Sequence, residues 1–198
     1  MGAIKFEDAR QYALQRLERE LSPNLLYHGI MHTRDDVVPA VEALAGQERV
    51  REDLRSLLVT AAWFHDLGFI ESVSNHESIS ARLAAEALPG FGFTAEEVEI
   101  IKGIILATVL PQNPKTHLEQ IMADADLDVL GRDDFMHYNS NLRNELALLG
   151  QQFSDFDWYA SQLQFLKSHT YFTASARALR DAGQLNNIRE LEKWLAGN

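Results

Sequence analysis

The chain has 198 residues, a formal net charge of −11, and no cysteine. It is long enough to bury a core without disulfides, and the missing cysteines exclude thiolate metal ligands and thiol nucleophiles. An acidic chain without a stripe of Lys and Arg argues against duplex nucleic acid as a partner. No apolar run approaches the roughly 18 residues of a membrane span, and the N-terminal stretch lacks a signal-peptide core, so we expect a cytoplasmic protein without a membrane partner.

Helix start and stop signals recur along the chain at helix-length intervals. Starts are predicted at Ser22 with Pro23, Thr94 with Glu97, Thr116 with Glu119, and Ser154 with Asp155. Stops are predicted at Gly46, Gly68, Gly90, Gly131, Gly150 and Gly183. Alternating β-branched runs are absent. These signals predict an all-α helical bundle of roughly eight or nine helices, forming a single domain over residues 1–198.

The first stretch with chemical interest is YHGIMHTRDDVV, residues 27–38. It places His28 and His32 four residues apart, which would put both on the same face of a helix. The two residues are either surface histidines of an ordinary helix or the first part of a metal site completed further along the chain.

The next segment, residues 51–64, has a core-facing stripe. Leu54, Leu57, Leu58, Ala61 and Phe64 follow helical spacing, and His65 extends the stripe by four residues from Ala61. His65 is therefore predicted to point inward. A buried histidine followed directly by Asp66 needs a partner that makes burial tolerable, and a metal ion is one such partner.

Further nitrogen and oxygen donors follow in chain order, at His76 and Asp126. Such donors suit a hard or borderline divalent ion. Any one of these histidines is more often a hydrogen-bonded core residue than a ligand. The order His, His-Asp, Asp on successive helices is the more specific signal.

In this order the sequence resembles the HD superfamily of metal-dependent phosphohydrolases, whose motif is H…HD…D. The matching stretches are YHGIMHT, AAWFHDLGF, HESISARLAAEAL and ADADLDVLG, within residues 27–131; the helices of residues 132–198 would pack on this part. The resemblance implies that one divalent ion (Mn, Mg, Co, Ni, Fe or Zn) is bound by His32, His65, Asp66 and Asp126. Asp126 matches the family pattern better than Asp124.

The YH-x3-H start is similar to the cyclic-nucleotide phosphodiesterase branch of this superfamily, in which the first histidine donates a proton. This similarity implies that His28 is a general acid, with Asp66 accepting a proton from water; alternatively, His28 packs against the turn after Pro23. His76 matches one of two further histidines found in two-metal members, but Thr108 stands near the place of the other. His76 is then a weak extra ligand, a ligand reached through water, or a substrate contact, and Thr108 lines the pocket or bonds its own helix.

Several other residues have two interpretations. Glu71 and Glu77 are either partners or a base near the metal, or solvated carboxylates. Lys167, His169 and Arg177 form either a positive rim for phosphate or an ordinary solvated helix face. The C-terminal third is predicted to form two long amphipathic helices. Its aromatic residues are expected in the core or in an interface, so a homodimer is possible; they are Phe153, Phe156, Trp158, Phe165 and Phe172.

The favoured function is a metal-dependent phosphohydrolase that cleaves a phosphomonoester or phosphodiester, with a nucleotide as the expected small-molecule substrate. Two alternatives stay open: a noncatalytic HD module for signalling or binding, and an HD-type di-iron oxygenase, against which Thr108 argues. No G-x-S-x-G elbow, Walker A loop, dinucleotide fingerprint or H-E-x-x-H pair is present.

Overall fold

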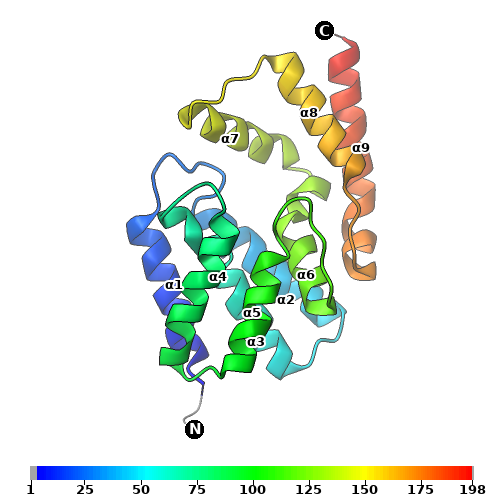
Figure 1. The fold of residues 1–198 in the computed structure, drawn as a ribbon. Helices are drawn as coiled ribbons and strands as arrows, with labels where there is room; N and C mark the ends of the chain where they lie inside the picture. Colours follow the sequence, from blue (N-terminus) through cyan, green and yellow to red (C-terminus); the bar gives the residue numbers. More distant parts are fainter. Residues whose placement is uncertain (1–3, 198) are drawn as a thin grey trace.

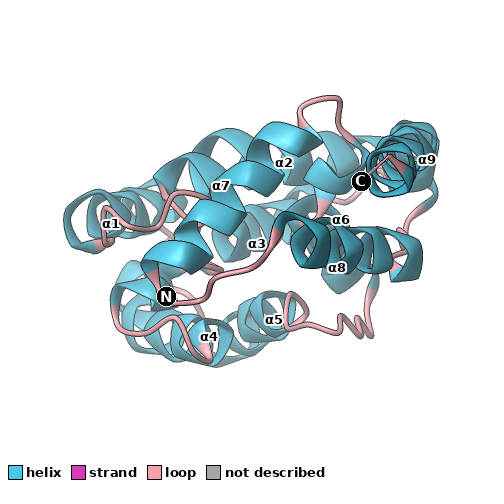
Figure 2. Cartoon of the chain, turned by 90° about the horizontal axis from the view of Figure 1, so that it is seen from above, coloured by secondary structure: helices cyan, strands magenta, loops and turns pink. Residues whose placement is uncertain are grey.

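The computed structural model describes residues 4–197, and in this range it contains nine α-helices and no strand (Figures 1 and 2). Their bounds are Phe6–Glu20 (α1), Val38–Gln47 (α2), Glu52–Phe64 (α3), His76–Ala87 (α4), Ala95–Leu106 (α5), His117–Asp126 (α6), Phe135–Leu148 (α7), Asp155–Ser168 (α8) and Ala174–Ala196 (α9). The all-α prediction and the helix number are confirmed. None of these helices combines the length and the apolar content that crossing a membrane requires.

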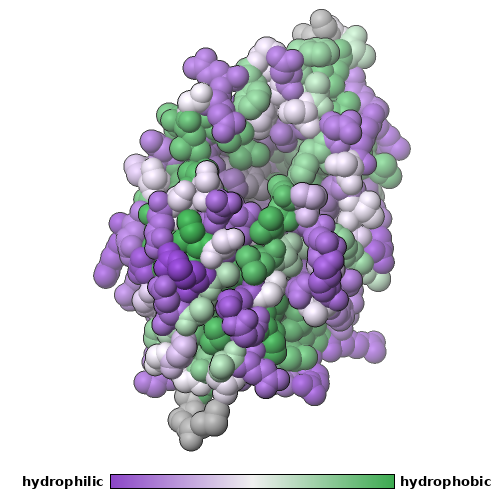
Figure 3. Space-filling view, in the orientation of Figure 1, coloured by the Kyte–Doolittle hydropathy of each residue, from purple (hydrophilic) through white to green (hydrophobic). Residues whose placement is uncertain are grey.

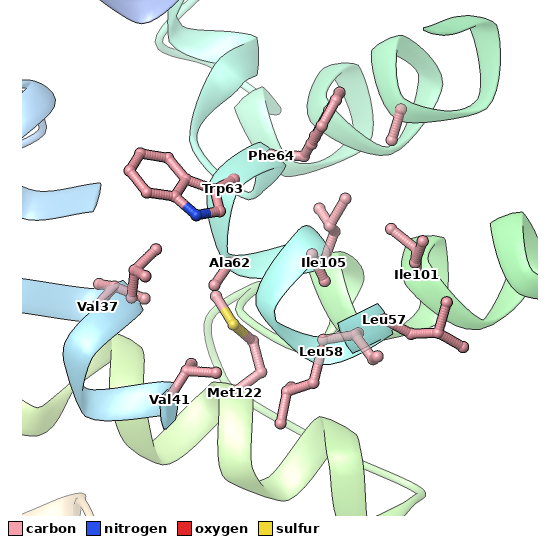
Figure 4. Close-up of a cluster of buried hydrophobic side chains, with 14 of the residues drawn as sticks. Val37, Val41, Leu57, Leu58, Ala62, Trp63, Phe64, Ile101, Ile105 and Met122 are labelled. Atoms are coloured by element: carbon pink, nitrogen blue, oxygen red, sulfur yellow. The ribbon is translucent and has the colours of Figure 1, made fainter. Parts of the chain in front are cut away.

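The main hydrophobic core is built around α3, which contacts α1, α2, α4, α5 and α6. Figure 4 shows Leu57, Leu58 and Phe64 of α3 against Ile105 of α5 and Met122 of α6. Each fully buried side chain of this size contributes roughly 1.5 to 3 kcal/mol. The stripe predicted for residues 54–64 does face this core, and its packing fixes the end of α3, where His65 begins the loop.

A second, smaller cluster joins α7, α8 and α9 to a short 3-10 turn, Asp128–Gly131 (η4). Leu130, Phe135, Leu166 and Leu191 are buried in it. The two long C-terminal helices are as predicted, and α7 and α8 lie above the main bundle in Figure 1. The aromatic residues divide unequally: Trp158 is buried, whereas Phe153 and Phe156 are 38% and 56% exposed, so the last two are not core residues.

Three of the predicted helix starts are correct. Thr94 and Glu97 form a complete capping box before α5, and Thr116 and Ser154 cap α6 and α8. The start at Ser22 and Pro23 is wrong, because the chain there turns without entering a helix until residue 30. His28 consequently does not share a helix face with His32, although the two rings are neighbours, 5.9 Å apart at their centroids.

Two predicted helix stops show how differently glycines are used. Gly150 follows α7 with a φ of +89°, as a helix-ending glycine does. Gly183 is not a stop: it lies inside α9. A Cβ there would be 2.0 Å from the carbonyl oxygen of Gly131. Gly183 is therefore used for the close approach of α9 to η4, a tertiary requirement that local sequence does not reveal.

His32 opens a π-helical segment, His32–Val37 (η1), that leads into α2. Pro39 lies in the first turn of α2. A proline has no N–H, and its ring would collide with the carbonyl of Asp35 in an uninterrupted α-helix. The wider turn avoids this conflict, with the N–H of Val38 bonded to the oxygen of Thr33 five residues earlier. Such π-turns are frequent at functional sites.

Candidate metal centre

His65 lies directly after α3 and is completely buried. Its Nδ1 donates a hydrogen bond to the carbonyl oxygen of Ala62 at 2.8 Å. This bond fixes the ring and leaves Nε2, on the opposite side, as the atom that can take either a proton or a metal ion. A backbone carbonyl that orients an imidazole in this way is a common outer partner of a metal-binding histidine.

Three other side chains converge on this Nε2 atom. Asp66 Oδ2 lies 3.2 Å and Asp126 Oδ1 3.5 Å from His65 Nε2. His32 Nε2 lies 3.3 Å from Asp126 Oδ1 and 3.7 Å from Asp66 Oδ2. The four sequence-predicted ligands are thus adjacent in space, although they come from η1, the end of α3 and the end of α6.

This arrangement fits a divalent cation. Two donors bound to one ion by bonds of about 2.1 Å stand about 3.0 to 3.4 Å apart at angles between 90° and the tetrahedral value. The ligand atoms of His32, His65 and Asp66 all lie within 4.8 Å of one another. His65 Nε2 and Asp66 Oδ2 are also buried without a hydrogen-bond partner. Unpaired buried polar atoms are costly, and an ion between them would remove the cost.

The electrostatics of the cluster also favour a cation. Burial would raise the pKa of both carboxyls, but the neighbouring imidazoles outweigh it, lowering that of Asp126 to about 2 and that of Asp66 further. Burial would lower the pKa of His65, yet the charges of Asp66 and Asp126 raise it well above its usual value. Both carboxylates are therefore ionised, and the field that attracts a proton to Nε2 equally attracts a metal ion.

Asp124, the alternative to Asp126, has a structural role on the same helix. Its carboxylate accepts hydrogen bonds from the backbone N–H groups of Phe172 and Thr173 and from the Thr173 hydroxyl, at 2.7 to 2.8 Å. These bonds attach the segment before α9 to α6. Asp126 instead lies beside His32 and His65, and it is the aspartate that the family pattern favoured.

His28 is held beside this cluster by Glu145, a residue that sequence reasoning missed. Glu145 is 1% exposed. Its Oε1 is 2.5 Å from His28 Nδ1, and its Oε2 accepts the backbone N–H groups of Tyr27 and His28 at 2.8 and 3.0 Å. Burial would lower the pKa of His28, but the bond to Glu145 and the charge of Asp66 raise it. The carboxylate of Glu145 thus favours the protonated form of His28.

The remaining candidates divide into those that reach the cluster and those that do not. His76 Nε2 is 3.6 Å from Asp66 Oδ1, so the two oxygens of Asp66 face different histidines. Glu77 lines the same cavity. Both alternatives for Thr108 hold together, because it lines the cavity and its hydroxyl also donates a hydrogen bond to the carbonyl oxygen of Ile105 near the end of α5. Glu71 lies away from the cavity, in an exposed ion pair with Arg82.

A cavity of about 310 Å³ opens onto the ligand cluster. Asp66, His76 and Asp126 line it on one side, and side chains of the smaller hydrophobic cluster, from η4, α7 and α8, line it on the other. Figure 3, in the orientation of Figure 1, shows a hollow in the surface just below the region of α7 and α8. This volume is at the lower end for ligand pockets, which suits one small molecule.

The positive rim considered for the C-terminal third is not formed. Lys167 pairs with Glu192 at 2.6 Å, and Arg177 donates to the carbonyl oxygens of Tyr171 and Phe172. His169 is partly buried, and its Nε2 has no hydrogen-bond partner. These three side chains are absent from the cavity lining within the described range.

His169 gives stability a pH dependence. Burial lowers the pKa of its imidazole to about 4, against about 6.5 in the unfolded chain. Between these values the unfolded chain binds the extra proton, so stability falls as pH falls through this window. When the pH is lowered from 7.5 to 5, the wild type should lose about 1 kcal/mol more free energy of unfolding than His169→Gln, which lacks the imidazole. This value is discounted for the partial exposure of His169. Urea denaturation at both pH values checks this; a pH-independent difference would contradict it.

No family model and no curated protein matches this sequence. The chain is similar to the crystal structure of a protein from Lactobacillus plantarum, with a TM-score of 0.67 and 18% sequence identity. The likeness covers 98% of this chain and 97% of that one. At this identity the likeness concerns the fold alone.

Proposed function

We propose that this protein is a metal-dependent phosphohydrolase that releases phosphate from a phosphomonoester or cleaves a phosphodiester, and that the substrate is a nucleotide. The proposal is carried by the convergence of His32, His65, Asp66 and Asp126, with His65 Nε2 and Asp66 Oδ2 buried and unpaired beside the cavity. This donor set has the order and chemistry of the HD motif noted in the sequence. Ligands from three separate segments are a stronger sign than any single histidine.

A divalent ion would be held by these four side chains, and when bound it supplies Lewis-acid activation of water and of a phosphate oxygen. The chain's own groups then have distinct tasks. Asp66 has Oδ2 near His65 and Oδ1 near His76, and Oδ1 is the oxygen that accepts a proton from the attacking water. His28 keeps Nδ1 bonded to Glu145, which leaves the Nε2 proton for the leaving oxygen.

The role of His28 as an acid predicts a selective loss. In His28→Ala, the rate with poor leaving groups such as alkyl phosphates should fall by about 100-fold or more, because these depend on protonation. The rate with 4-nitrophenyl phosphate should fall much less. Glu145→Gln should show the same pattern in weaker form, because the amide of this variant would turn an N–H toward a donor. Steady-state kinetics on both substrate types checks this; equal losses for both would refute proton donation.

The direct test of the proposed function is a phosphate-release screen on metal-free protein supplied with Mn, Mg, Co, Ni, Fe or Zn. The substrates are mono-, cyclic and polyphosphorylated nucleotides. We expect metal-dependent release from at least one nucleotide and none from His65→Ala. Release that persists in His65→Ala would point to a contaminant. Two irons per chain, with oxidation of a small molecule and no release, would replace the hydrolase by an oxygenase.

A further inference from the structure

The end of the cavity away from the metal ligands has a different character. Its wall is formed by apolar side chains of η4, α7 and α8 together with two amides, Asn139 and Gln162; the apolar residues are Leu130, Phe135, Leu142 and Phe165. Within residues 4–197, no Lys or Arg lines any part of the cavity. A second charged group on the ligand would find no counter-charge at this end, whereas a neutral, flat group would be well accommodated.

A chain of hydrogen bonds fixes the two amides. Trp158 Nε1 donates to Asn139 Oδ1 at 2.7 Å, and Asn139 Nδ2 donates to Gln162 Oε1 at 2.7 Å. An indole N–H can only donate, so it determines which end of the Asn139 amide is oxygen. Trp158 and Asn139 are 2% and 3% exposed, so no water competes for this arrangement.

This chain of hydrogen bonds also fixes the orientation of the Gln162 amide. Its oxygen is occupied by Asn139, so its NH2 group must be the other end of the amide. Among the described residues, that NH2 group has no hydrogen-bond acceptor, and Gln162 lines the cavity. The buried indole therefore determines, through Asn139, that the cavity is offered N–H donors and not a carbonyl oxygen.

We propose that Gln162 is a specificity-determining residue that donates hydrogen bonds to an acceptor on a flat, neutral group of the substrate, of the kind a nucleobase carries. The apolar side chains contact the faces of this group, and Gln162 reads its edge. The inference rests on the proposed function for the position of the phosphate, at the metal ligands. It adds the chemical class of the rest of the substrate. The substrate carries one phosphate, and its other end is an uncharged planar group that accepts hydrogen bonds.

The test uses two variants of Gln162 and a matched control. Gln162→Glu keeps an oxygen for Asn139 and removes the N–H donors, and Gln162→Met removes the donors without adding charge. Gln164→Glu adds the same charge on the same helix at an exposed position. The substrates are uridine and adenosine 5′-monophosphates, compared with phenyl phosphate, which has a flat body without an acceptor.

We expect the wild type to favour the better nucleotide over phenyl phosphate in kcat/KM. Both Gln162 variants should raise the KM for that nucleotide by about tenfold and lower its preference over phenyl phosphate in kcat/KM by a similar factor. Gln164→Glu should behave as wild type. Gln162 variants that discriminate as the wild type does would overturn the proposal and leave Gln162 as a structural partner of Asn139.

A binding measurement separates this inference from the proposed function. If the wild type hydrolyses none of these esters, the hydrolase proposal fails, but calorimetric titration with uridine, adenosine and benzyl alcohol still tests Gln162. Binding of a nucleoside by wild type, weakened about tenfold in both Gln162 variants, supports the donor role. No nucleoside binding, or equal binding by wild type and variants, overturns it.

Discussion

Asp126→Asn is expected to abolish metal retention and to lower phosphate release by more than about 100-fold. Loss of an outer hydrogen-bond partner of a metal ligand already costs 10- to 100-fold, so loss of a ligand costs at least as much. Asp126 Oδ1 faces both His32 and His65, and an amide nitrogen or a neutral oxygen cannot replace its charge. The fold should persist, because this carboxylate bonds no backbone group in the described range.

Asp124→Asn is the matched control, the same change two residues earlier on α6. It should keep the metal and most of the activity. It should also lose about 1 to 3 kcal/mol of stability, because the amide NH2 would face the N–H of either Phe172 or Thr173, which also can only donate. Metal content, phosphate release and urea denaturation of the two variants check the pair. If Asp124→Asn lost the metal and Asp126→Asn kept it, the ligand assignment would be wrong.

Gly68→Ala should be among the most destabilising single changes in the chain. Gly68 lies in the 3-10 turn Leu67–Ile70 (η2), just after His65 and Asp66. A Cβ there would be 2.0 Å from the carbonyl oxygen of His76 and 2.9 Å from the backbone nitrogen of Ser80. Both neighbours are backbone atoms of α4, so α4 must move away. We expect a loss of about 3 kcal/mol, and a melting temperature lower by about 6 to 12 °C.

The same displacement would disturb the proposed ligand Asp66, two residues before Gly68, and move His76 away from it, so Gly68→Ala should also weaken metal binding. Gly90→Ala is the control, because a Cβ at Gly90 meets no atom within 4 Å. It should change the melting temperature by no more than about 2 °C. Calorimetry on both variants, with and without Mn, makes the measurement. A Gly68→Ala protein as stable as the wild type would show that α4 and η2 are not as tightly packed as described.

The residues of the candidate metal centre could be predicted from sequence because two of them, His65 and Asp126, are marked by local context. The apolar spacing before His65 indicates that it points inward, and Asp126 ends an apolar helix. The order of the donors along the chain then suggested a joint site. Helix starts at Thr94 and Ser154 were predictable for a similar reason, since a cap depends only on residues three positions apart.

The rest of the site depends on contacts between distant segments. Glu145 lies 117 residues after His28, in a stretch that reads as an ordinary helix, so nothing local distinguishes it from a solvated glutamate. Gln162 acquires a fixed orientation only through hydrogen bonds that involve Asn139 on α7 and Trp158 on α8. Gly183 was mistaken for a helix end, because the reason for a glycine there is the close approach of the Gly131 backbone, which leaves no room for a Cβ. Local sequence does not encode such contacts in a readable form.

The measurement that tests the central claim most directly is the metal content of purified protein, determined by elemental analysis after dialysis against each divalent ion in turn. The ligand cluster predicts at least about one ion per chain for the wild type with one or more of Mn, Fe, Co, Ni and Zn. It predicts none for His65→Ala, with the far-UV circular dichroism of the two proteins nearly equal. Wild-type protein that retains no metal, or His65→Ala that retains as much as the wild type, would contradict the account.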